Sequence, residues 1–273
     1  MRESLIIRVL EKIELSLYRH SNKIIVVSPS FKENLVSRNV NAEKIFTIMN
    51  GVDLSRFSPK PRSISLAKKY NIADNKFVIG YIGTHGMAHA LDNVLKTASL
   101  LQNEKNILFM FVGTGAEREA LIEKARNLQL TNILFIPAQP KETISDYWSL
   151  CNVALVHFKN TPIFSVSIPS KIFEAMGMGL PILLASPKGA ASDIVLNENV
   201  GLWVPAEDPT ALADAVIQLN KKPGLLAQFS KISLDSAQHH TREAQARNFL
   251  DALDFKSISK SSLQYSQDKS NLI

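Results

Sequence analysis

The chain has 273 residues, of which 45% are hydrophobic and 21% charged, the balance of an ordinary globular protein. Its single cysteine, Cys151, excludes an internal disulfide and gives no support for a thiolate metal site, which favours a reducing, cytoplasmic setting. No apolar run approaches the ~20 residues needed to span a bilayer, and the charged N-terminal stretch is unlike a signal peptide. The net charge of +6 fits phosphorylated ligands, nucleic acid or a membrane surface, and equally a solvated surface with no partner.

Short β-branched runs alternate with longer amphipathic stretches along the chain. The runs predicted as strands are 23–28, 45–49, 77–82, 107–112, 132–136, 153–157, 181–185 and 200–204. The stretches predicted as helices are 90–102, 117–128, 141–150, 170–178, 209–221 and 241–253. Apolar strands alternating with helices indicate an α/β fold with a Rossmann-like, doubly wound parallel sheet covered on both faces.

A connector rich in Gly, Pro and polar residues occupies 51–65 and separates two parts of the chain. Residues 1–55 hold too few elements to bury both faces of a sheet, so they are expected to close a domain whose first part is missing. Residues 56–255 form the main predicted domain. The polar, patternless stretch 256–273 is expected to be a disordered tail.

Two glycine turns follow neighbouring predicted strands and precede helices. The first is Gly83-Thr84-His85-Gly86 and the second is Gly113-Thr114-Gly115. In an open α/β sheet, ligands bind past the carboxyl ends of the strands, and glycine lets the backbone approach a phosphate. Tight turns without a ligand remain the alternative. Neither turn matches the phosphate-loop or the complete dinucleotide fingerprint, which disfavours both of those classes.

A third segment, 168–181, begins a helix at which a cation lies close to the N-terminus. Pro169 suits the first helical position, and Ile168 before it has no side-chain oxygen to cap the helix. Lys171 opposes the helix dipole, at a cost of roughly 0.3–1 kcal/mol. A bound anion would compensate for both features.

Glu174 lies three residues after Lys171, on the same face of this predicted helix. One interpretation is an intrahelical ion pair on the surface. The apolar neighbours Ile172 and Phe173 argue instead for a helix buried on most sides, where a charged pair is more often functional.

Three stretches together resemble glycosyltransferase family 4, whose members are retaining enzymes of the GT-B fold. SIPSKIFEAMGMGLPIL, followed by GLWVPAEDPTALADAV, is similar to the donor-binding, C-terminal lobe of that family. NKIIVVSPSFKENLV and KIFTIMNGVDLSRFSP are similar to its passage between lobes. The likeness runs from about residue 8 to 254. It implies that 1–55 is a remnant of the acceptor lobe with the connector, and that 56–255 is the nucleotide-sugar-binding domain.

The resemblance implies a role for each matching residue. Glu174 would accept hydrogen bonds from the ribose hydroxyls, and Lys171 would face the donor diphosphate. The loop of Gly83 and Gly86 would approach the diphosphate and the acceptor side, while backbone groups around 137–139 would hold the base. No metal is expected. The donor-binding residues so predicted are Gly83, Thr84, His85, Gly86, Gly113, Gly115, Pro137, Ala138, Gln139, Ser170, Lys171, Ile172 and Glu174.

The sequence departs from the family pattern at two places. The family's second glutamate, eight residues before the first, is replaced by Val166, and the usual Arg/Lys pair after the first glycine loop is absent. The PSKIFE helix is similar to that of bacterial surface-polysaccharide transferases such as N-acetyl-L-fucosamine transferases. In that subgroup Lys171 would substitute for the lost positive charge.

The histidines near these segments carry weaker signals. His85 is expected to cap a helix or lie in solvent, with contact to a phosphate or hydroxyl as the less favoured alternative. His239 and His240 have no metal-ligand spacing and are interpreted as incidental.

The leading hypothesis is a retaining transfer from a nucleoside diphosphate sugar, expected to be UDP-linked, to a glycan or lipid-linked acceptor in surface polysaccharide synthesis. The acceptor-lobe catalytic residues would be missing, so a truncated remnant or a split enzyme with an N-terminal partner chain is expected. The location would be cytoplasmic, with peripheral contact at the inner membrane face as a further option. The alternatives are a non-catalytic nucleotide-sugar-binding module and a GT-B epimerase, which would need carboxylates and a histidine on both lobes. The sugar, acceptor, linkage and oligomeric state stay open.

Overall fold

The computed structural model describes residues 5–253, and the predicted tail over 256–273 lies outside this range. The chain divides into two compact units, one of Met1–Gly51 with Arg242–Ile273 and the other of Val52–Thr241. The helix after Thr241 therefore groups with the first 51 residues, whereas the sequence placed it in the larger domain. The chain passes between the units twice, at Gly51 to Val52 and at Thr241 to Arg242.

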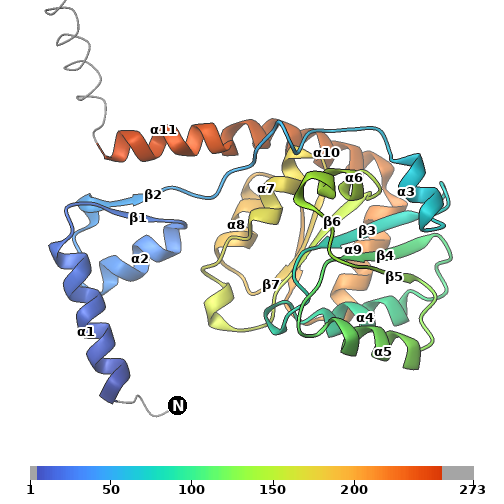
Figure 1. Ribbon diagram of the computed structural model, residues 1–273, viewed down its shortest axis with the longest axis horizontal. Helices are drawn as coiled ribbons and strands as arrows, with labels where there is room; N and C mark the ends of the chain where they lie inside the picture. Colours follow the sequence, from blue (N-terminus) through green and yellow to red (C-terminus); the bar gives the residue numbers. More distant parts are fainter. Residues whose placement is uncertain (1–4, 254–273) are drawn as a thin grey trace, which may run out of the picture. The chain divides into compact units, whose positions relative to one another are not determined.

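The larger unit is built around six parallel strands (Figure 1). Its elements are α3 (Ile64–Lys69), β3 (Phe77–Ile82), α4 (Leu91–Leu100), β4 (Ile107–Val112), α5 (Arg118–Asn127), β5 (Ile133–Ile136), α6 (Ile144–Trp148), β6 (Val153–His157), α7 (Ser170–Gly177), β7 (Ile182–Ser186), α8 (Ala190–Asn197), β8 (Gly201–Pro205), α9 (Pro209–Lys221) and α10 (Pro223–Ala237). Every predicted strand of this unit is present, within one residue at either end.

The order of the strands is β5-β4-β3-β6-β7-β8. The chain moves outward from β3 to β5, returns to the other side of β3 with β6, and then continues outward to β8. The direction of winding thus reverses between β3 and β6. At such a reversal, the loops that follow the strands diverge and leave a crevice at the carboxyl edge of the sheet.

Helices cover both faces of this sheet. In Figure 1, α4 and α5 lie on one side of the strands, and α6 and α7 lie on the other. On the first side, α4, α5 and α9 pack with alternate strand residues such as Ile79, Phe109 and Leu183 into one hydrophobic core. The strand residues between them, such as Met110 and Leu184, are just as deeply buried. Burial on both faces explains why these strands are continuous apolar runs and not alternating patterns.

Three helices of this unit, α3, α8 and α10, were absent from the sequence prediction. In α10 the fully buried side chains are Phe229, Ser233 and Ala237, spaced four residues apart. A stripe this narrow, containing a serine and an alanine, gives only a weak apolar period. Ser233 can be buried without a large cost because its hydroxyl donates to the carbonyl of Leu180 at 3.1 Å.

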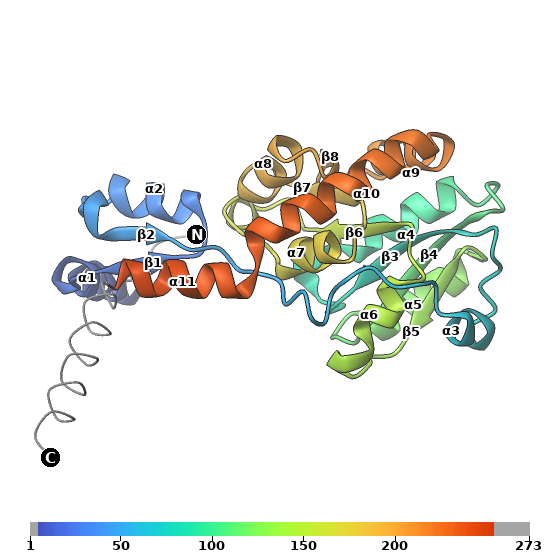
Figure 2. The same cartoon turned by 90° about the horizontal axis from the view of Figure 1, so that it is seen from above.

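The smaller unit contains a two-stranded parallel sheet (Figure 2). Its elements are α1 (Leu5–His20), β1 (Ile24–Val26), α2 (Pro29–Ser37), β2 (Ile45–Thr47) and α11 (Arg242–Ala252). A small core of Ile24, Val26, Leu35, Val40 and Ile45 joins the strands to α2. Helix α1 buries none of its residues fully. Among the helices within residues 5–253, none combines the length and apolarity that crossing a membrane requires.

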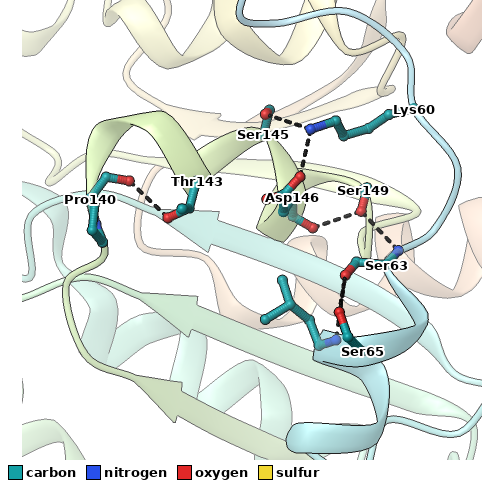
Figure 3. A network of polar contacts seen from close by, with 9 residues as sticks. Lys60, Ser63, Ser65, Pro140, Thr143, Ser145, Asp146 and Ser149 are labelled. Atoms are coloured by element: carbon teal, nitrogen blue, oxygen red, sulfur yellow. Dashed lines mark hydrogen bonds and ion pairs between the residues drawn. The ribbon is translucent and has the colours of Figure 1, made fainter.

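The connector that follows Gly51 is held to the larger unit by polar contacts (Figure 3). Lys60 Nζ donates to Ser145 Oγ at 3.1 Å and to Asp146 Oδ1 at 2.5 Å. Three residues later, the backbone N–H of Ser63 donates to Ser149 Oγ at 3.2 Å. The connector therefore lies along α6, beside the loop that follows β5.

The connector also packs against the end of α7, and this contact can be tested. A Cβ atom on Gly177 would lie 2.6 Å from the carbonyl oxygen of Phe57, a backbone atom that cannot move easily. We expect Gly177→Ala to lower the free energy of unfolding by roughly 1–3 kcal/mol. Gly224→Ala, in α10, meets nothing within 4 Å and should raise it by up to ~1 kcal/mol. Urea unfolding of both variants measures the two opposite effects, and equal stability of Gly177→Ala and the parent would contradict this packing.

Candidate functional site

A hollow of about 480 Å³ lies at the carboxyl edge of the sheet in the larger unit. Residues that follow β3, β4 and β5 line it, together with the first turn of α7, which follows β6. The hollow is thus formed where the strand order reverses, and its volume suits a ligand of nucleotide size. Its lining residues are Ile82, Gly83, Thr84, His89, Val112, Gly113, Thr114, Ala138, Gln139, Lys141, Ile144, Ser170, Lys171 and Glu174.

The first two loops are hydrogen-bonded to each other beyond the ends of their strands. Gly83 donates its N–H to the carbonyl of Val112 at 2.9 Å, and His85 donates its N–H to the carbonyl of Thr114 at 2.8 Å. The ladder between β3 and β4 therefore continues into the loops. This continuation brings the loop backbones close together and forms one wall of the hollow.

The close approach of the loops explains two glycines that the sequence suggested for ligand contact. A Cβ on Gly113, which has a φ of 151°, would lie 1.9 Å from the carbonyl oxygen of Gly83. A Cβ on Gly115 would lie 2.3 Å from the carbonyl oxygen of His85. Loop–loop packing alone requires glycine at both positions. Gly113 still lines the hollow, whereas Gly115 does not.

Lys171 reaches from α7 across the end of β3. Its Nζ lies 4.1 Å from the centroid of the Tyr81 ring, which places the cation over the aromatic face. A Cβ on Gly83 would lie 2.8 Å from the same Nζ, so the ammonium group sits against the first glycine loop. Burial lowers the pKa of Lys171 to about 8, and the nearby Glu174 carboxylate opposes that shift. The hollow thus holds a cation that has given up much of its hydration.

Helix α7 also directs its N-terminus at this place. The helix begins at Ser170 and Pro169 is its capping residue, so both lie one position later than the sequence suggested. Pro169 supplies no side-chain acceptor, so the helix lacks a side-chain cap. The first-turn N–H groups and the positive end of the dipole favour an anion in the hollow. Glu174, half-buried one turn further along, lines the same hollow.

The segment after β5 closes the remaining side. Ala138 and Gln139 line the hollow, and Pro137 does not. The Gln139 side chain is fixed at both ends, because its Nε2 donates to the carbonyl of Pro137 at 2.9 Å and its Oε1 accepts from the Tyr147 hydroxyl at 2.8 Å. Because this side chain is already hydrogen-bonded, the polar groups that it leaves free in the segment are those of the backbone.

Five of the predicted donor-binding residues do not line the hollow: Gly86, Gly115, Pro137, His85 and Ile172. Ile172 is fully buried in the core of the unit. The structure brings the other eight together, namely Gly83, Thr84, Gly113, Ala138, Gln139, Ser170, Lys171 and Glu174.

The sequence predicted that His85 caps a helix or lies in solvent, and both predictions are wrong. It is fully buried, with its ring centroid 5.9 Å from that of Tyr81 and 6.0 Å from that of Phe111. Neither ring nitrogen has a hydrogen-bond partner within residues 5–253. Burial, followed by the charges of Arg118 and Lys171, lowers the pKa of His85 to about 4. His85 is therefore a neutral packing residue beneath the loops.

Sequence reasoning missed six lining residues: Ile82, His89, Val112, Thr114, Lys141 and Ile144. Ile82 and Val112 end their strands, and Thr114 lies inside the second glycine turn, so position alone could have indicated these three. His89 could not be predicted, because the path of the loop after Gly86 cannot be read from the sequence.

His240 is not incidental. Its Nε2 lies 2.8 Å from Glu198 Oε1, and its ring is buried beside Phe173 of α7, with centroids 4.9 Å apart. Its backbone carbonyl accepts from the N–H of Val52 at 2.7 Å. His240 therefore anchors the start of the connector. Among the described residues, no group of three or more His, Cys, Asp or Glu side chains is placed to hold a metal ion.

The model of the family described as glycosyl transferases group 1 matches residues 63–234, which contain the whole hollow. The chain belongs to the group 1 glycosyl transferases. The model for glycosyltransferase family 4 matches residues 2–56. The family predicted from the sequence is thereby confirmed, while the finer likeness to N-acetyl-L-fucosamine transferases stays a prediction.

Relatives of this glycosyltransferase chain are longer than it is. A Pseudomonas aeruginosa protein named "Probable glycosyltransferase WbjE" is 27% identical over 222 residues, which cover 80% of this chain and 54% of WbjE. A Streptococcus pneumoniae alpha-galactosylglucosyldiacylglycerol synthase is 20% identical over 254 residues, or 89% of this chain and 63% of the synthase. The chain thus spans about half to two thirds of the length of these curated relatives.

Solved structures share the fold of this glycosyltransferase chain. Anabaena HepE in complex with UDP superimposes with a TM-score of 0.79 at 18% identity, over 89% of this chain and 66% of HepE. WaaG, a glycosyltransferase involved in lipopolysaccharide biosynthesis, gives a TM-score of 0.72 at 14% identity, over 91% of this chain and 67% of WaaG. These neighbours are GT-B glycosyltransferases, and they confirm the predicted fold class.

The buried cation makes the stability of the chain depend on pH. The pKa of Lys171 is about 8 in the folded chain, against the ordinary lysine value of 10.5 that applies to the unfolded chain. Between these two pH values the unfolded state therefore binds more protons than the folded state. The contribution of Lys171 to the free energy of unfolding therefore rises as the pH increases from about 8 to 10.5. We expect the free energy of unfolding of the parent, relative to Lys171→Met, to increase by roughly 1–3 kcal/mol from about pH 7 to about pH 10.5.

Urea unfolding at the two pH values measures this difference. Lys188→Met, which removes an exposed lysine, provides the matched control and should show no such change. A constant difference between the parent and Lys171→Met would mean that the ammonium group is not desolvated.

Proposed function

We propose that this chain carries the donor-binding lobe of a retaining glycosyltransferase, which transfers a sugar from a UDP-sugar to a glycan or lipid-linked acceptor in surface polysaccharide synthesis. One observation carries the proposal. A desolvated lysine and a carboxylate from the same helix, Lys171 and Glu174, line one hollow at the reversal of the strand order. Family membership supports glycosyl transfer as the chemistry.

The two charges suit different parts of such a donor. The carboxylate of Glu174 can accept hydrogen bonds from both hydroxyls of a ribose. Lys171, the N-terminus of α7 and the two glycine loops suit the diphosphate. When the bond between the sugar and the phosphate breaks, negative charge grows on the leaving diphosphate, and a preorganised cation stabilises it. In this proposal no metal is needed for that charge.

Uracil is proposed as the base, held by the segment 137–139. The support is that the solved HepE complex, which shares this fold, contains UDP. Surface polysaccharide synthesis is proposed because WaaG is involved in lipopolysaccharide biosynthesis. The acceptor, the retaining stereochemistry and a separate chain that would supply the acceptor lobe are parts of the same proposal.

A second candidate is a module that binds a nucleotide sugar without transferring it. The observation that favours it is that every residue of the hollow lies within the larger unit, Val52–Thr241. Binding would then need no other part of the protein. Turnover of a UDP-sugar by the chain together with candidate acceptors would exclude this second candidate.

The proposal predicts selective nucleotide binding that depends on one carboxylate. Calorimetric titration of the chain with UDP, GDP and ADP should show that UDP binds best. Glu174→Gln removes the charge at nearly constant shape, and it should weaken UDP binding by roughly 1.5–3 kcal/mol, which is about tenfold to a hundredfold.

Glu123→Gln, an exposed change on α5, should bind UDP like the parent and serves as the control. If Glu174→Gln also binds like the parent, the ribose role of Glu174 is wrong. If a folded parent binds none of the three nucleotides, the donor-lobe proposal fails as a whole.

A further inference from the structure

His89 lines the hollow, and the structure holds its imidazole ring by one edge only. Its Nδ1 lies 3.2 Å from the carbonyl oxygen of His157, at the end of β6. In return, His157 Nδ1 lies 2.8 Å from the carbonyl oxygen of His89. The second nitrogen of His157, Nε2, lies 3.0 Å from the amide nitrogen of Asn93. Stacking on Phe158, with ring centroids 5.6 Å apart, fixes the plane of the His89 ring.

These contacts determine where the protons lie. A carbonyl oxygen can only accept a hydrogen bond, so Nδ1 carries a proton in both histidines. His157 Nε2 must then accept from the Asn93 amide, which makes His157 neutral. In a neutral His89 the proton is likewise on Nδ1, and Nε2 is left as a bare acceptor. Within the described part of the chain Nε2 of His89 has no hydrogen-bond partner, although the residue lines the hollow.

The surroundings of His89 disfavour a positive charge in the empty hollow. The titratable and charged groups around it are Lys171 from α7, Tyr81 from β3, His157 from β6 and the buried His85. Burial and the charge of Lys171 lower the pKa of His89 to about 4, against a smaller opposing effect of the His157 carbonyl. A protonated His89 would be a second cation beside Lys171 in this desolvated hollow, where Glu174 is the one carboxylate among the described lining residues.

An anion in the hollow reverses this balance. A diphosphate offers acceptor oxygens, and a neutral His89 meets them with a lone pair. Protonation of Nε2 converts that lone pair into an N–H donor while the contact of Nδ1 to His157 stays unchanged. The ring needs no rotation, because His157 and Phe158 already hold it in place.

We propose that His89 is a proton-linked anion-binding residue, which takes up a proton from solvent on Nε2 as the donor diphosphate enters beside Lys171. His157 and Asn93 act as positioning residues, since they hold the ring and its tautomer without reaching the ligand. This inference rests on the proposed donor-binding function and adds the group that responds to pH. The complex holds one more proton than the empty site, so nucleotide affinity rises as the pH falls. The rise ends at the pH at which His89 is protonated in the empty site as well.

Proton counting by calorimetry tests the proposal with UDP as the probe. The parent, His89→Gln and His89→Lys are titrated at about pH 6 in two buffers of different protonation enthalpy, which gives the number of protons taken up on binding. UDP contributes its own protons equally in all three, so differences among the proteins report on residue 89. Thermal unfolding beforehand shows that each variant is folded.

The parent should take up about one proton more than His89→Gln, and His89→Gln should bind UDP roughly tenfold to a hundredfold more weakly. His89→Lys carries its charge before binding, so it should retain most of the affinity and lose the extra proton uptake. His239→Gln, an exposed change, should match the parent in both measurements.

Equal proton numbers for the parent and His89→Gln, with UDP still bound, would overturn this inference and leave the proposed function intact. Weaker binding by His89→Lys than by His89→Gln would overturn it too, because a cation at this position would then be unfavourable. Failure of the folded parent to bind UDP would instead refute the proposed function, and the inference would fall with it.

Discussion

The parallel ladder between β3 and β4 continues beyond the strands, and the rest of the site depends on that continuation. Hydrogen bonds from Gly83 and His85 to the second loop draw the two loop backbones together. No side chain fits between them, so glycine is required at 113 and 115. The same contact buries His85 below the loops and leaves the space above Gly83 open to the ammonium group of Lys171. A backbone constraint thus determines which side chains reach the hollow.

The electrostatics of the hollow follow from desolvation. Lys171 lies over an aromatic ring and against a glycine loop, where water cannot solvate it fully. With one cation held there, the neighbouring histidines stay neutral, and burial is the larger cause in each case. Holding a desolvated cation costs free energy, and a bound anion would offset that cost. Natural proteins keep such locally unfavourable arrangements mainly at functional positions, where the stability lost is recovered on binding.

Prediction from the sequence succeeded where one local period carried the information and stopped where a loop path decided the outcome. Lys171 and Glu174 could be paired because residues three apart on a helix share a face. His85 lies within the first glycine turn and His89 follows that turn, and nothing in their spacing shows that the first is buried and the second lines the hollow. In the same way, α11 has the period of a helix, but its membership of the smaller unit depends on contacts with the N-terminal segment.

The sequence by itself determined the α/β class, the six strands of the larger unit, the charged pair on α7 and the family, because each is written in local periodicity or in a contiguous motif. The tertiary structure alone decided the strand order, the closure of the two glycine loops, the grouping of α11 and the contact of His89 with His157. Each of these joins segments far apart in the chain. Local propensity says which face of an element is buried, but long-range packing decides which other segment buries it.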